Sequence, residues 1–166
     1  SDETGIYRYK FDVPKSWAGQ RVKIFFDGVM TDAEIIINGK PAGELHQGGF
    51  YRFSYDITEL LNLGKKNQLE VKVAKESANR SINAAERKAD WWLFGGIYRP
   101  VWLEVLPQIH MKHFVLSADH KGKFQASIDM EGDAKGHEIV VSVRSLKDGK
   151  TVYTSNGQTT ITHPIN

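Results

Sequence analysis

The residue types best suited to bind a ligand come together where Asp90 precedes the adjacent indoles of Trp91 and Trp92. An ionised carboxylate accepts strong, charge-assisted hydrogen bonds from two neighbouring hydroxyl groups. An indole offers a flat apolar face, although large aromatic side chains more often pack in a core. The structural alternative is that Asp90 caps a turn or pairs with Arg87 or Lys88 on the surface. Successive residues of a strand point to opposite faces, so the two tryptophans cannot both line one site.

Metal and nucleophile chemistry finds little support elsewhere in the sequence. The chain has no cysteine, which rules out a thiolate metal site and a disulfide framework. His110 and His113 lie three residues apart on a predicted strand, so they should point to opposite faces and cannot share an ion. We therefore predict no metal site, and no nucleophile-elbow pattern supports a serine hydrolase. The other histidines are scattered among predicted turns: His46, His120, His137 and His163.

The composition is that of an ordinary globular protein, with 40% hydrophobic and 25% charged residues in 166. The net charge of +2 is spread along the chain without a basic cluster, so no nucleic-acid partner is expected. No apolar run approaches the roughly 18 residues that a membrane-spanning helix needs, and no signal peptide opens the chain. We expect no membrane partner.

Apolar and polar residues alternate with a period of two almost throughout, which is typical of half-buried β-strands. Asn38-Gly39 is a two-residue hairpin signal, because both positions tolerate positive φ. The sequence predicts little helix beyond one capped helical turn at 56–61. We interpret the stretch from Glu76 to Asp90 as a long loop, because its apolar residues are too few to cover a helix face. The pattern predicts an all-β sandwich or barrel, with alternating runs at 7–13, 22–26, 33–37, 51–57, 69–73 and 101–105.

Pro107 marks a predicted domain boundary, because proline cannot donate to a sheet ladder and the alternation restarts after it. The domains expected are therefore 1–106 and 107–166. The second contains about four strands, whereas an immunoglobulin-like sandwich needs about seven in about 100 residues, so it looks incomplete. Lys147 to Lys150 is predicted to form a hairpin turn. Gly95 and Gly96 should allow a tight turn, and Arg99 should lie across the sheet, paired with a carboxylate.

The run DWWLFGGIYRPVWLE at 90–104 resembles the end of the sugar-binding domain of glycoside hydrolase family 2, which includes β-galactosidases, β-glucuronidases and β-mannosidases. Three upstream motifs resemble the same domain, in the same order. Each motif is weak alone, but four in the family's order are specific, and together they cover 7–106. The upstream motifs are YRYKFDVP at 7–14 with Trp17 and Gly19, DGV at 27–29 with INGK at 37–40 and Gly43, and GGF at 48–50 with Phe53 and DIT at 56–58.

The resemblance implies a jelly-roll sugar-binding sandwich that lacks its first strands, followed by a partial immunoglobulin-like sandwich. It also implies that both catalytic glutamates lie in a (β/α)₈ barrel, which needs about 250 residues and cannot fit here. This chain would then contain no catalytic residue. In the family, the acidic residue at the place of Asp90 reaches substrate hydroxyls in the barrel and, in some members, helps to hold a sodium ion. Either Trp91 or Trp92, as the second substrate-binding position expected beside Asp90, would border the sugar.

The function expected is thus the non-catalytic part of an enzyme that hydrolyses β-linked glycosides, most simply a β-galactosidase-like one. The partner expected is a carbohydrate substrate, bound together with the missing barrel, and a homo-oligomer is compatible with the sequence. We favour a bacterial periplasmic or secreted location over the cytoplasm. Two alternatives stay open: a free-standing carbohydrate-binding module, and a structural β-sandwich pair of an adhesin. The apparent lack of several strands argues against the first, and the motif at 90–104 argues against the second.

Overall fold

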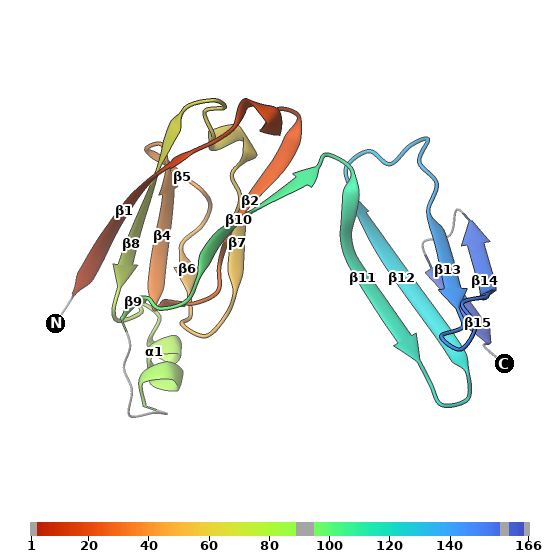
Figure 1. The fold of residues 1–166 in the computed structure, drawn as a ribbon. Helices are drawn as coiled ribbons and strands as arrows, with labels where there is room; N and C mark the ends of the chain where they lie inside the picture. Colours follow the sequence, from red (N-terminus) through yellow and green to blue (C-terminus); the bar gives the residue numbers. More distant parts are fainter. Residues whose placement is uncertain (1–2, 89–94, 157–159, 165–166) are drawn as a thin grey trace. The chain divides into compact units, whose positions relative to one another are not determined.

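A computed structural model describes residues 3–88, 95–156 and 160–164. The chain divides into two compact units, Ser1–Pro107 and Gln108–Asn166. The boundary predicted from the sequence, after residue 106, lies one residue earlier. Figure 1 shows that nearly all regular structure is β-strand, so the predicted all-β class is confirmed. In these described ranges, no helix is both long and apolar enough to cross a membrane.

Unit 1 is a sandwich of two antiparallel sheets (Figure 1). Among its described residues, the β8 sheet has the order β1-β8-β4-β5, with β6 also paired to β4, and the β2 sheet has the order β10-β2-β7. A further short pair joins β3 to β9. The strands are β1 Thr4–Asp12, β2 Gln20–Phe26, β3 Val29–Met30, β4 Asp32–Ile37, β5 Lys40–Pro41, β6 His46–Gln47, β7 Phe53–Asp56, β8 Lys66–Ala74, β9 Gly96–Ile97 and β10 Val101–Pro107. Short 3₁₀ turns occupy Lys15–Trp17 and Thr58–Leu60, and α1 spans Arg80–Arg87.

The core lies between the inner faces of β2, β4 and β8. Ile24 and Phe26 of β2 face Ile35 of β4 and Val71 of β8, and each of these side chains is at most 2% exposed. Phe26 stacks on Phe53 of β7, with ring centroids 5.0 Å apart. Because side chains alternate between the two faces of a strand, one apolar residue in two is enough to fill this layer.

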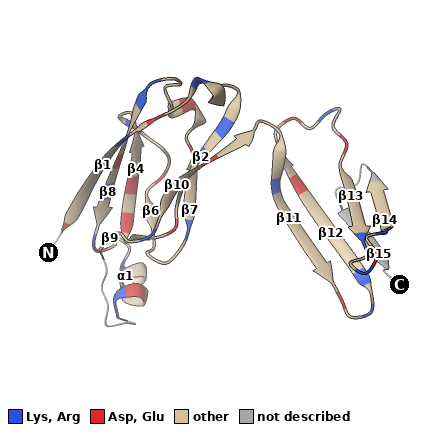
Figure 2. Ribbon diagram, in the orientation of Figure 1, with Lys and Arg blue, Asp and Glu red and all other residues tan. Residues whose placement is uncertain are grey.

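The outer face of the β8 sheet is polar, and oppositely charged side chains stand across from one another. Arg8 pairs with Glu70 at 2.6 Å, and Lys72 pairs with Glu34 at 3.0 Å. Figure 2 shows acidic and basic positions interspersed along the strands of unit 1. Exposed pairs of this kind contribute little to stability, so their main effect is to keep the outer face soluble and in register.

The Asn38-Gly39 hairpin forms as predicted between β4 and β5, with φ values of 51° and 80°. Asn38 also donates from Nδ2 to Oδ1 of Asn67, at 2.7 Å. Asn67 is 1% exposed, and its amide joins this turn to the loop at 62–65: it accepts from the Asn62 N–H and donates to the carbonyls of Asn62 and Lys65.

In unit 2, β11 (His110–Ala118), β12 (Lys123–Glu131) and β15 (Thr160–Pro164) form one antiparallel sheet, in that order. β13 (Val140–Arg144) and β14 (Thr151–Asn156) form a separate hairpin, whose turn is the predicted one at 147–150.

A register shift between Met111 and His113 corrects the prediction that His110 and His113 point to opposite faces. The bulge inserts an extra residue into β11, so His110 stands opposite Glu131 and His113 opposite Asp129. These two partners are two residues apart on β12, which returns both histidines to one face of the sheet. Strict alternation could not reveal this, because a bulge leaves no clear mark in the apolar pattern.

We predict that Asn67→Ala lowers the free energy of unfolding of unit 1 by about 2–4 kcal/mol, because buried backbone and side-chain groups lose their partners. Urea unfolding followed by tryptophan fluorescence measures this change. Asn62→Ala is the matched control: the Asn62 side chain is exposed, so the change should stay within about 0.5 kcal/mol. Equal effects of the two substitutions would contradict the role given to the Asn67 amide.

Candidate functional site

The predicted site residues Asp90, Trp91 and Trp92 lie outside the described residues, but the elements on both sides of them are described. α1 precedes the segment and β9 follows it, and Figure 1 places both at the same end of unit 1. The site can therefore be built from these flanking elements and from the end of the sandwich that holds them. We call this end the rim, and define it as Met30, Thr31, Asp32, His46, Gln47 and Gly49.

α1 corrects the prediction that 76–90 is a loop throughout. Asn79 caps the helix: its side-chain oxygen accepts from the N–H groups of Ser81 and Ile82, at 3.0 and 3.5 Å. Asn83 fixes the same turn, because its side chain accepts from the Ser77 N–H and donates to the Ser77 carbonyl. The helix has no fully buried residue, which is why an argument from apolar residues could not find it.

Polar contacts attach the last turn of α1 to the rim. Glu86 accepts from the Gly49 N–H at 2.8 Å, and Arg87 donates from Nη2 to the Thr31 hydroxyl at 3.2 Å. On the other side of the segment, Gly96 of β9 pairs with Met30 of β3. The chain therefore enters 88–95 from a residue bound to Thr31 and leaves it at a residue bound to Met30. Two adjacent rim residues thus hold both ends of the segment that carries Asp90.

Asp32 is the rim residue that sequence reasoning missed. It is 5% exposed, and its Oδ2 accepts from Gln47 Nε2 at 3.0 Å and from the Ala78 N–H at 2.9 Å. These bonds join β4, β6 and the start of the loop before α1. The available signal was Thr31-Asp32, a polar pair that interrupts an otherwise apolar stretch between Val29 and Ala33.

His46 lies in β6 and not in a turn, as the sequence had indicated. Its ring stacks on Phe53, with centroids 3.6 Å apart, and Nε2 lies 2.8 Å from the Gly48 carbonyl. Burial lowers the pKa of His46 below 6.5, although Gly48, Asp32 and Glu86 act in the opposite direction. A neutral His46 then donates from Nε2 to the Gly48 carbonyl, beside the bend at Gly49.

Gly49 and Gly96 are the two glycines on which this end of the sandwich depends. Gly49 donates to Glu86, and its carbonyl accepts from the Tyr98 hydroxyl. Gly96 has a φ of 84°, and a Cβ there would overlap the Tyr7 hydroxyl. The turn predicted at this glycine is therefore required by both conformation and space. Arg99 differs from its prediction in that it donates to the Asp27 backbone carbonyl, at 3.5 Å, rather than to a carboxylate.

The described part of the rim holds a loop in place and does not itself supply a reaction centre. In the described ranges, no group of three or more His, Asp or Glu side chains is arranged to hold a metal ion. The polar side chains of the rim bond to backbone and to one another, although Oδ1 of Asp32 is buried without a partner among the described residues. What the rim does is fix the described residues on either side of 89–94, the segment that carries the predicted site residues.

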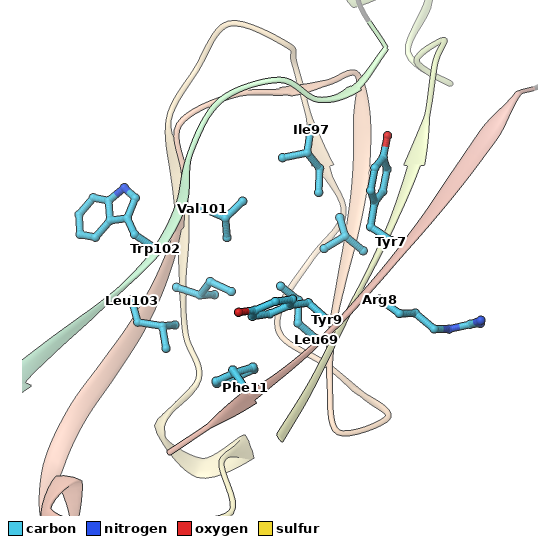
Figure 3. Close-up of a pocket in the computed structure, with 11 residues that line it drawn as sticks. Tyr7, Arg8, Tyr9, Phe11, Leu69, Ile97, Val101, Trp102 and Leu103 are labelled. Carbon is cyan, nitrogen blue, oxygen red and sulfur yellow. The ribbon is translucent and has the colours of Figure 1, made fainter. Parts of the chain in front are cut away.

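A second feature of unit 1 is an apolar groove of about 480 Å³ between β1 and β10, shown in Figure 3. Tyr7, Tyr9 and Phe11 line it from β1, and Val101 and Leu103 line it from β10. Arg8 also borders it, but its guanidinium points away, toward Glu70. A sugar site needs several convergent hydrogen-bonding groups, which this lining lacks, so we do not assign the groove to carbohydrate.

The face of β1 that lines the groove corrects another expectation. The alternation of Tyr7, Tyr9 and Phe11 predicted a buried face, yet Tyr7 is 42% and Tyr9 67% exposed. Tyr7 packs in part against Gly96 of β9, whereas Tyr9 turns toward the sandwich interior and stays largely uncovered by the described residues. Val13, at the end of the same run, is 1% exposed, so the burial fails only along β1 itself.

The described fold defines a class: an antiparallel β-sandwich, followed by a second β-rich unit. Comparison with known proteins narrows the class to one family. Residues 1–107 match the family model "Glycosyl hydrolases family 2, sugar binding domain". The chain therefore belongs to glycoside hydrolase family 2, through its sugar-binding domain, and the resemblance seen in the sequence is confirmed.

Individual relatives agree with this assignment. A β-galactosidase of Thermoanaerobacter pseudethanolicus is 35% identical over 133 residues, covering 80% of this chain and 18% of that protein. A β-glucuronidase of Bacteroides fragilis is 34% identical over 99 residues, covering 60% of this chain and 14% of that protein.

The solved structure of Faecalibacterium prausnitzii β-glucuronidase matches with a TM-score of 0.73 and 25% identity, over 97% of this chain and 31% of that one. The structure of Ruminococcus gnavus β-glucuronidase bound to D-glucuronic acid matches with a TM-score of 0.76 over 97% of this chain and 30% of that one, but at 19% identity it supports the fold alone. The chain thus spans less than a fifth of these two curated relatives and about a third of the two solved chains.

We predict that His46 titrates below pH 6.5 and that this costs stability in acid. Because the pKa of His46 is lower in the folded than in the unfolded chain, the unfolded chain binds more protons as the pH falls through 6.5. The free energy of unfolding should therefore decrease between pH 7.5 and the folded-state pKa of His46. NMR titration of the ring and urea unfolding at pH 7.5 and 5.5 measure both effects.

The variant His46→Gln should lose less stability between these two pH values than the unmodified chain does. His120→Gln is the matched control, because His120 is exposed, and it should keep the full pH dependence. An unchanged pH dependence in His46→Gln would contradict the role given to burial of His46.

Proposed function

We propose that this chain is the non-catalytic sugar-binding and scaffold portion of a glycoside hydrolase that cleaves β-linked glycosides, most simply β-galactosides. The observation that carries the proposal is the family match over 1–107. A β-galactosidase that is 35% identical over 80% of the chain supports the choice of galactosides. The named β-glucuronidases make glucuronides the competing substrate class.

The reaction itself would be carried out by residues outside this chain. Glycoside hydrolysis uses two carboxyl groups on either side of the scissile bond, about 5–5.5 Å apart in retaining enzymes and farther apart in inverting ones. The rim carboxylates do not suit this work: Asp32 is buried and bonded to Gln47 and Ala78, and Glu86 is bonded to Gly49. Their part is structural.

We predict that residues 1–166 alone turn over no glycoside. Chromogenic β-galactoside, β-glucuronide and β-mannoside substrates should all give background rates at micromolar protein, since the proposal assigns the two-carboxyl centre to residues outside this chain. Turnover faster than about 1 s⁻¹ on any of these substrates, a low but ordinary enzyme rate, would overturn the proposal that the chain is an accessory portion.

Within the proposal, Asp90 is the contact between this domain and the substrate. An ionised carboxylate at the surface costs little, and its hydrogen bonds gain strength when a neighbouring domain closes over it and excludes water. The described residues on either side of its segment, Arg87 and Gly96, are bound to adjacent rim residues, Thr31 and Met30.

A sodium ion beside Asp90 belongs to the same proposal, as an ion held partly by that carboxylate. The described residues near the rim assemble no donor set for it, since Asp32 and Glu86 bond to neighbouring side chains and backbone. An exported location and self-association of the parent protein are further proposals that rest on the family alone.

We predict that Asp90→Asn in the full-length enzyme lowers kcat/KM by about 10- to 1,000-fold, or about 1.4–4 kcal/mol of transition-state binding, with an unchanged Tm. The cause is the loss of a charged acceptor for substrate hydroxyls. Steady-state kinetics and thermal melts measure the two quantities. Glu76→Gln, an exposed carboxylate just before α1, is the matched control and should leave kcat/KM within twofold. Equal kinetics for both variants would remove Asp90 from the site.

A further inference from the structure

The turn at Asn38-Gly39 combines a chemically labile sequence with a fully bonded side chain. Asparagine followed by glycine deamidates readily, because a residue without a Cβ leaves its backbone nitrogen unhindered beside the preceding side-chain amide. Gly39 is exposed, and a Cβ built on it would meet no atom within 4 Å, so solvent reaches this turn. What protects the Asn38 amide is therefore its own set of hydrogen bonds.

The Asn38 side chain continues the ladder between β4 and β8 beyond the last paired residues, Ile37 and Leu69. Its Oδ1 accepts from the Gln68 N–H at 2.9 Å, and its backbone N–H donates to the Gln68 carbonyl at 2.9 Å. Its Nδ2 donates to the Leu60 carbonyl at 2.8 Å and to Oδ1 of Asn67 at 2.7 Å. Both hydrogens of the amide are thus in use, and each meets an oxygen.

Asn67 has no freedom to present anything but an oxygen to Asn38. Its Oδ1 also accepts from the Asn62 N–H at 2.7 Å, and its Nδ2 donates to the carbonyls of Asn62 and Lys65, both at 3.0 Å. Turning this amide over would set Nδ2 against an N–H and Oδ1 against two carbonyls. Because Asn67 is only 1% exposed, water cannot repair such a mismatch. Both groups that face Asn38 Nδ2 are therefore fixed acceptors.

We infer that Asn38 is a site of spontaneous deamidation that the folded chain protects, and that the reaction, once it has occurred in an opened chain, destabilises the fold. The Gly39 nitrogen loses its proton to solvent and forms a bond to Cγ of Asn38. The bond from Cγ to Nδ2 breaks, and the nitrogen takes up a proton and leaves as ammonia. Water then opens the resulting succinimide ring, at Cγ to give aspartate or at the backbone carbonyl to give isoaspartate.

The protection follows from the bonds that the reaction must break. Nδ2 can leave only after its contacts with Leu60 and Asn67 are lost, and Cγ can turn toward the Gly39 nitrogen only after Oδ1 releases Gln68. In the folded chain the reaction therefore waits for a local opening of the end of the ladder. Its rate is the rate in the unfolded chain multiplied by the small fraction of open molecules.

The loss of stability follows from what the product would meet on refolding. Aspartate at position 38 keeps the Gln68 N–H as a donor but sets a charged oxygen against the Leu60 carbonyl and Asn67 Oδ1, where the amide had donated. Isoaspartate adds a methylene group to the main chain of a two-residue turn, whose register is fixed by Ile36 opposite Pro41 and Ile37 opposite Lys40. Neither product can restore the original contacts.

The protection is tested in the unsubstituted chain, incubated at mildly alkaline pH in buffer and in concentrated urea. Peptide mass spectrometry measures the conversion of Asn38. The folded chain should react at least about 10-fold more slowly than the unfolded one. In urea, Asn156, which Gly157 follows in the sequence, is the internal reference and should react within about threefold of Asn38. Equal rates for Asn38 in buffer and in urea would overturn the inference.

The destabilisation is tested with Asn38→Asp, which reproduces one product. Asn38→Gly is the matched control, since it tolerates the φ of 51° and removes the same side-chain bonds without adding a charge. The Tm of Asn38→Asp should lie at least about 4 °C below that of Asn38→Gly at neutral pH. Failure of Asn38→Asp alone to fold would agree with this order, whereas an equal or higher Tm would contradict it. These outcomes are independent of any glycosidase activity.

Discussion

The structure of unit 1 depends on one apolar layer between two sheets. β8 is paired on both sides, with β1 and β4, and its inner residues Val71 and Val73 are almost fully buried against the β2 sheet. β2 is paired in the same way, with β10 and β7. Because these two central strands carry the layer, the elements around them need only polar contacts to stay in place. The Asn38–Asn67 pair and the contacts of α1 are examples of such contacts.

The rim shows how a polar cluster can be tolerated next to this layer. Thr31 and Asp32 are nearly inaccessible, a position that would cost several kcal/mol without hydrogen bonds. They bind Lys75, Gln47 and the chain at Ala78, and Thr31 receives Arg87. The stiff end of the sandwich is thereby connected to the helix before Asp90 and to the strand after Trp92. Functional residues are positioned more precisely when rigid elements support them.

Period-two alternation was enough to predict the fold, because it reports which residues of a strand can face a core. It correctly located the six longer strands of unit 1, the turn at Asn38-Gly39 and the turn at 147–150, but not the two-residue strands β3, β5, β6 and β9. It could not report α1, which is held by the side chains of Asn79, Glu86 and Arg87 and not by an apolar stripe. It also could not report whether a neighbouring strand covers an apolar face, so the exposure of Tyr9 was unforeseen.

The candidate site was accessible from sequence only in part. The family motif supplied Asp90, Trp91 and Trp92, and their roles stay predictions because they lie outside the described residues. The rim that supports them was missed, since Asp32, His46 and Gly49 are separated along the sequence and come together only through the pairing of β4 with β6. The bulge before His113 was missed for a similar reason, because a single inserted residue changes faces without changing composition.

The pairing of β10 with β2 also has a consequence for the order in which the chain can fold during synthesis. Val101 joins Phe26, and β1 joins β8 across more than half of unit 1, so its sheets depend on contacts between distant parts of the sequence. β11 and β12, by contrast, are consecutive and can pair as soon as they are made. Non-local pairing is slow because a long loop must close, at a cost in chain entropy, before any favourable contact forms to offset that cost. Unit 1 therefore stays incomplete until Pro107 has been synthesised, and its apolar strands need protection from aggregation for most of that time.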